Sequence, residues 1–259
     1  MPSDLLSNYL EFTKIRNSCS GKIVDLSSHY WMFPTTLLPL ITYLQSKGIG
    51  YVEPKSPKLS SYMSHMMTQQ NGFCTDGKTY LPITRLPTNQ EKAKNILQQI
   101  FSLPDIGNDC GGEQAFKYLI SELVDNIYQH SCFRFANIMA QKYPTLKFVD
   151  ISILDDGISI PGCFEKAGMR LNDCDALIDA INGLSTKEKD RGFGLCSCVR
   201  IFTEGIKGQI LIVSRNGAIS FENNKTIAYK LHDSHKLNGT LINVRTPIST
   251  EAVNIYAYV

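Results

Sequence analysis

The chain has 259 residues, 43% hydrophobic and 19% charged, and this balance allows a core of normal size. The formal net charge of +2 lacks the strong positive charge typical of nucleic-acid-binding proteins, so no nucleic acid partner is expected. No apolar run approaches the length of a membrane span, and the N-terminus shows no signal-peptide pattern. We therefore expect a cytoplasmic protein without a membrane segment.

Residues 1–87 predict a small α/β domain. Periodicity and composition indicate helices at 5–15, 33–47 and 59–70, and strands at 21–26, 49–52 and 79–86. Gly48 is suited to end the second of these helices, because glycine tolerates the left-handed conformation common at that position. The order strand, Ser27, helix, strand gives this part a weak resemblance to STAS domains.

Residues 88–259 predict an α+β domain, a two-layer α/β sandwich with helices on one mixed sheet. Helices are expected at 90–101 and 113–131, and an apolar strand is expected at 146–154. Asparagine and glycine turns then separate four antiparallel strands, at 209–213, 219–221, 226–231 and 240–244.

The helix at 113–131 carries two polar residues at the margin of its apolar face. Its apolar residues form one stripe: Phe116, Leu119, Ile120, Leu123, Val124 and Ile127. Glu122 and Asn126 lie four positions apart, next to each other at the border of this stripe. A ligand could meet these groups against apolar walls, and an ordinary solvated helix border explains them equally well.

The strand at 146–154 ends in Asp155, Asp156 and Gly157. Asp155 can accept a hydrogen bond from an exocyclic amine, and Gly157 allows close backbone approach or a positive φ. An ordinary acidic turn is the alternative explanation.

A third segment, Gly192-Phe193-Gly194-Leu195, follows Arg191 and is expected to open a helix. Backbone N–H groups at a helix start suit a phosphate. A dinucleotide-binding fingerprint would need a buried strand directly before the glycines, but residues 185–191 are polar. A P-loop is excluded, because no Gly-x-x-x-x-Gly-Lys-Ser/Thr string is present.

Together with Asn238-Gly239-Thr240, these segments resemble the N, G1, G2 and G3 boxes of the GHKL superfamily, the Bergerat-fold ATPases and kinases with a histidine kinase-like ATP-binding domain. The resemblance covers roughly residues 88–250. Glu-Leu-Val-x-Asn-x-x-x-His is most similar to the anti-sigma-factor serine kinases. Ser159 differs from the pattern, because the G1 box has its second glycine there; serine is accommodated if φ is negative.

The resemblance implies a role for each matching residue. Asn126 would coordinate Mg²⁺ bridging the phosphates of ATP, and Glu122 would be the general base. Asp155 would bind the adenine amine with support from Thr240, and Gly157 would let adenine approach the backbone. The remaining nucleotide contacts would come from the third box and from the G1 serine: Arg191, Gly192, Phe193, Gly194, Leu195 and Ser159.

The resemblance thus implies a protein that binds ATP and Mg²⁺ and hydrolyses ATP or transfers its γ-phosphate to a protein serine. Residues 162–191 would form a lid loop whose closure signals to a protein partner, with a homodimer left open. The alternative is a non-catalytic interaction module that uses bound ATP as a structural switch. A histidine kinase proper is disfavoured, because residues 1–87 predict α/β structure instead of a helical hairpin.

Overall fold

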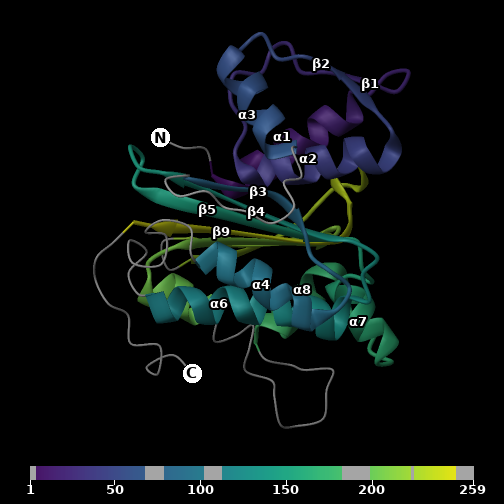
Figure 1. Ribbon diagram of the computed structural model, residues 1–259. Helices are drawn as coiled ribbons and strands as arrows, with labels where there is room; N and C mark the ends of the chain where they lie inside the picture. Colours follow the sequence, from purple (N-terminus) through teal and green to yellow (C-terminus); the bar gives the residue numbers. More distant parts are fainter. Residues whose placement is uncertain (1–3, 68–78, 102–112, 183–198, 223–224, 249–259) are drawn as a thin grey trace.

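The computed structural model describes residues 4–67, 79–101, 113–182, 199–222 and 225–248 (Figure 1). A seven-stranded sheet runs through the middle of this part in the order β3-β4-β5-β9-β6-β7-β8. Its strands are β3 (Tyr80–Arg85), β4 (Ala136–Tyr143), β5 (Phe148–Asp155), β6 (Gln209–Arg215), β7 (Gly217–Glu222), β8 (Lys225–Lys230) and β9 (Leu237–Pro247). Every pairing described within it is antiparallel, so the α+β class is confirmed while the expected mixed sheet is corrected.

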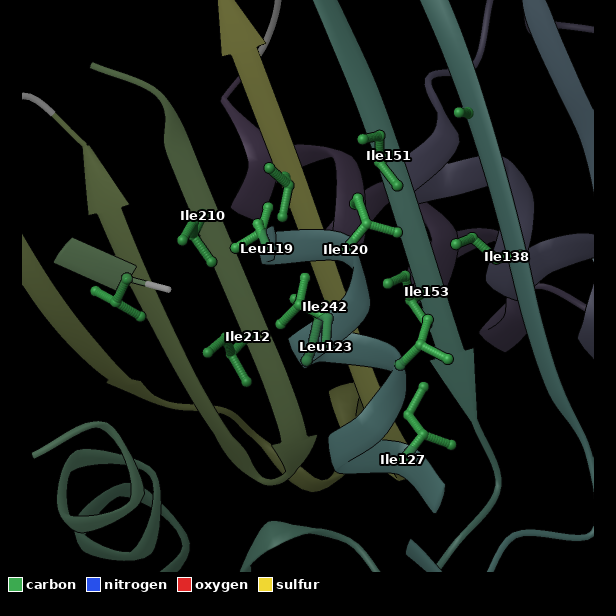
Figure 2. Packing of buried hydrophobic residues seen from close by; sticks show 14 of the residues in the cluster. Leu119, Ile120, Leu123, Ile127, Ile138, Ile151, Ile153, Ile210, Ile212 and Ile242 are labelled. Carbon is green, nitrogen blue, oxygen red and sulfur yellow. The ribbon is translucent and has the colours of Figure 1, made fainter. Parts of the chain in front are cut away.

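One face of the sheet is covered by the helices of the predicted two-layer sandwich (Figure 1). They are α4 (Gln90–Phe101), α6 (Glu113–Asn126), α7 (Ile160–Lys166) and α8 (Asp173–Ile181), with the short π-helices η1 (Ile127–Ser131) and η2 (Ile201–Gly205). Leu123 of α6 lies over the central strands, near Ile212 and Ile242 (Figure 2). The described part of the predicted apolar stripe, from Leu119 to Ile127, therefore faces the sheet.

The other face is covered by the N-terminal helices α1 (Leu5–Asn17), α2 (Pro34–Lys47) and α3 (Pro57–Met67) (Figure 1). A two-stranded parallel sheet, β1 (Ile23–Asp25) with β2 (Gly50–Val52), flanks them, and α2 connects its strands. Gly48 ends α2 in the left-handed conformation, as predicted. A short 3-10 helix, η3 (Asp233–His235), contacts α1 from the C-terminal half of the chain.

The strand predicted at 79–86 is present as β3, but it does not join the small sheet. It pairs with β4 at the edge of the large sheet, burying Leu81 on one face and Ile83 on the other. The N-terminal helices also share a hydrophobic cluster with sheet residues such as Met139 and Leu211. The N-terminal part therefore packs as a layer on the sheet, and the domain boundary at residue 87 stays a prediction.

The structure also contains one strand that was not predicted and corrects one predicted loop. The strand is β4, which is buried along most of its length between β3 and β5. The loop predicted from residue 162 contains α7 and α8, and α8 buries Leu177 and Ile181 against the core. Residues 183–191 of that loop lie outside the described part. No helix within the described ranges has the length and apolar character needed to span a membrane.

Candidate functional site

Three buried polar residues line up across one end of the sheet. Asp155 of β5 is paired with Thr240 of β9, which is paired with Ser214 of β6. Directly paired residues point to the same face of a sheet. Two positions further in, the same three strands carry Ile153, Ile242 and Ile212 beneath α6 (Figure 2). The polar row therefore lies on the sheet face that α6 covers, at the end of its apolar part. Asp155 is 3% exposed, Thr240 is 7% exposed and Ser214 is 0% exposed.

Ser214 connects the row to the start of α7. Its hydroxyl lies 2.9 Å from the Gly239 carbonyl oxygen and 3.0 Å from Thr240 Oγ1. It also accepts a hydrogen bond from the Ile160 backbone N–H at 3.1 Å. The serine thereby ties β6, β9 and α7 together. Sequence reasoning missed it, because its position opposite Thr240 depends on the register of two strands distant in the chain.

Asp155 is a buried acid without a cation beside it among the described residues. Burial raises the pKa of this carboxyl to about 7, and the negative charge of Asp156 adds to the rise. A hydrogen bond from the Gly157 backbone N–H to Oδ1, at 2.8 Å, acts in the opposite direction. Burying an ionised carboxyl without a cation costs stability, and acids with such raised pKa values are found preferentially at functional sites.

Gly157 has a packing reason to be glycine. A Cβ at this position would lie 2.2 Å from the Ser131 carbonyl oxygen and 2.6 Å from Ser131 Cβ. The same carbonyl oxygen accepts a hydrogen bond from the Ile158 N–H at 2.7 Å. Of the two predicted reasons, close backbone approach applies and positive φ does not. The close neighbour is the end of η1, so the protein itself explains this glycine.

Ser159 does not meet the condition stated for it. Its φ is +73° and its ψ is 161°, a combination that is essentially confined to glycine. The side chain is used, because its hydroxyl accepts a hydrogen bond from the Gly162 N–H at 3.2 Å and caps α7. The chain therefore tolerates a strained serine where the G1 pattern has glycine.

Glu122 and Asn126 are half-buried on α6, as the helical periodicity predicts. Burial raises the pKa of Glu122, and the nearby Asp125 carboxylate adds to this effect. The side-chain nitrogen of Asn126 is buried without a hydrogen-bond partner among the described residues. Asn126 directly precedes η1, which ends at Ser131 beside Gly157, so the chain connects this helix to the polar row.

The third box lies outside the described residues: Arg191, Gly192, Phe193, Gly194 and Leu195. Within the described ranges, no group of three histidine, cysteine or acidic side chains is placed to hold a metal ion. The Mg²⁺ expected at Asn126 therefore stays a prediction, as do the roles of the other residues. The four cysteines that the structure describes, Cys19, Cys132, Cys163 and Cys174, are free thiols.

No family model matches the chain, and no curated protein does. Among solved structures, the histidine kinase domain from Erythrobacter litoralis EL346 blue-light activated histidine kinase is similar over 94% of each chain, at 14% identity and a TM-score of 0.29. This likeness is too distant to identify a family.

Proposed function

We propose that this chain is a GHKL-type protein that binds ATP with Mg²⁺, and that it hydrolyses ATP or transfers its γ-phosphate to a partner protein. The observation that carries the proposal is the buried row of Asp155, Thr240 and Ser214, in which the acid has no described cation. Three oxygen-bearing side chains at the end of an apolar helix–sheet interface suit a flat, amine-bearing base.

The residues present fit the nucleotide at its base end. The direct pairing of Asp155 with Thr240 supports a shared contact with the base, since paired residues point to the same face of the sheet. Its pKa of about 7 means that it is ionised, and able to accept from an amine, at mildly alkaline pH. At the metal end, Asn126 would bind Mg²⁺ through its side-chain oxygen, because Mg²⁺ takes oxygen ligands and the amide nitrogen only donates hydrogen bonds.

The raised pKa of Glu122 supports its proposed role as a general base, because a base with a pKa closer to the working pH transfers protons more effectively. Glu122 would remove a proton from water or from a hydroxyl group of the partner. Bound ATP would supply the phosphoryl group, with Mg²⁺ offsetting its charge. The alternative, a non-catalytic switch module, needs the base contacts and not this carboxylate.

Binding is tested by titration calorimetry with ATP and Mg²⁺ at pH 8.5. Asp155→Asn replaces one acceptor oxygen with a donor, so we expect a loss of about 1.5–3 kcal/mol, roughly one to two decades in affinity. Asp156→Asn is the matched control, because Asp156 instead accepts from the backbone N–H groups of Arg134 and Phe135. Equal affinities for wild type and Asp155→Asn would remove the proposed base contact.

Chemistry is tested with labelled ATP, by following label into free phosphate or onto protein. Glu122→Gln should leave ATP binding close to unchanged and lower turnover by about 10²-fold or more, because a base acts on the transition state. Asp125→Asn, three positions along the same helix, removes a carboxylate that acts on Glu122 only through its pKa, so it should lower turnover far less than Glu122→Gln. Equal turnover in wild type and Glu122→Gln would favour the switch module.

A further inference from the structure

Ser214 is a buried residue whose hydrogen bonds can be assigned a direction by counting protons. A serine hydroxyl has one proton to donate and two lone pairs that accept. The Gly239 carbonyl oxygen can only accept, so it takes the Ser214 proton at 2.9 Å. The Ile160 backbone N–H can only donate, so it uses one lone pair at 3.1 Å. One lone pair on Ser214 is left.

Thr240 is the remaining partner, with its Oγ1 atom 3.0 Å from Ser214 Oγ. Since Ser214 has no second proton, Thr240 must be the donor in this bond. The Thr240 proton is therefore turned toward Ser214, and its oxygen presents lone pairs in the remaining directions. Ser214 is fully buried and Thr240 is 7% exposed, so water has little access to exchange these bonds.

We infer that Ser214 is a specificity-determining positioning residue that keeps Thr240 a hydrogen-bond acceptor, so that the site selects a base with an amino group over one with a carbonyl oxygen. The inference rests on the proposed function and adds a residue that sets the preference for the base. Asp155, when ionised, is also acceptor-only, so both paired residues, Asp155 and Thr240, present acceptors. An amino purine offers them a donor, whereas an oxo purine would bring a third acceptor to this pair.

The test compares ATP with inosine triphosphate, which has a carbonyl oxygen in place of the amino group and an N–H at the neighbouring ring nitrogen. Both differences are present for every variant, so the readout is the change in preference on substitution. Both affinities are measured by calorimetry at pH 8.5, above the pKa of Asp155. Ser214→Ala frees the Thr240 hydroxyl to rotate and donate to the carbonyl. We expect the preference for ATP over inosine triphosphate to fall by about fivefold, the worth of one ordinary hydrogen bond. A merely structural role would weaken both nucleotides equally and leave the ratio unchanged.

Thr240→Val is the second variant, because it removes the hydroxyl while keeping the side-chain shape and the Ser214 contacts to Gly239 and Ile160. It should lower the same preference, and adding Ser214→Ala to it should change the preference no further. An unchanged preference in either single variant that binds ATP would overturn the inference and leave the proposed function standing. Wild-type protein that binds no ATP would instead overturn the proposed function itself.

Discussion

Strand β5 carries two buried acids, Asp150 and Asp155, that face opposite sides of the sheet and differ in whether a cation lies beside them. Asp150 is fully buried on the side of the N-terminal helices, where Arg245 bonds both of its carboxylate oxygens at 2.7 and 2.8 Å. That guanidinium also lies 4.5 Å from the ring centre of Phe148 and 5.2 Å from that of Phe33. Asp155, on the α6 side, has no such cation among the described residues.

The difference separates structure from candidate function. Burial raises the pKa of both carboxyls, but at Asp150 the Arg245 cation opposes the rise. A buried acid with a bidentate cation has its charge compensated within the fold. A buried acid without one carries a cost when it is ionised, which the hydrogen bond from the Gly157 N–H offsets only in part. Polarity inside the sheet therefore does not mark a candidate site by itself, whereas a buried acid without a cation beside it does.

The largest test of this comparison is the removal of Arg245. Arg245→Met should destabilise the protein by about 3–5 kcal/mol, because it leaves the Asp150 carboxylate buried and unpaired. The double variant Asp150→Leu with Arg245→Met should recover most of that loss, since no charge then remains. Urea unfolding of both variants measures the difference. A single variant as stable as wild type would show that the pair does not compensate the charge.

The second test uses pH at Asp155. The carboxyl pKa is about 7 in the folded protein against an ordinary value of 3.8, so between these values the folded state holds a proton that the unfolded state releases. Stability from this group is thus fully present below pH 3.8 and is lost as pH rises toward 7, by up to about 1.4 kcal/mol per unit.

Asp155→Asn removes this titration while keeping the size of the side chain. The difference in unfolding free energy between wild type and Asp155→Asn should therefore change across pH 4–7, in favour of the variant as pH rises. A pH-independent difference for Asp155→Asn would mean that its pKa is not raised and that the contrast between the two acids fails.

Local patterns in the sequence predicted much of the fold. Helices α2, α4 and α6 follow from apolar periodicity, and the predicted Asn216-Gly217 turn does separate β6 from β7. The turn predicted at Asn238-Gly239 is wrong, because both residues lie inside β9. β4 escaped prediction because alanine, methionine and glutamine favour helices, and its strand form depends on the two strands that flank it. The sheet partner of β3 likewise depends on pairing across more than fifty residues.

The sequence predicted residues of the candidate site, but not the strand pairings and hydrogen bonds that join them. Asp155 and Thr240 follow from short motifs, yet the sequence contains nothing local that puts Ser214 beside them. The backbone strain at Ser159 was equally hidden, because a residue's φ depends on how α7 is held against the sheet. Motifs point to candidate side chains, and strand register decides which other side chains lie beside them.

The smallest expected effect concerns that strain, which lies at the Asp155 end of the sheet. Ser159→Gly relieves a φ of +73° with a ψ of 161°, worth about 1–3 kcal/mol, and loses a cap that glycine replaces at a cost of a few tenths. Since glycine also adds freedom to the unfolded chain, the net gain should be about 1 kcal/mol in urea unfolding. Lys147→Gly, at φ +57° in the β4–β5 turn, is the control distant in sequence. If Ser159→Gly were less stable than wild type, the lost hydroxyl cap on Gly162 would outweigh the strain relieved at this position.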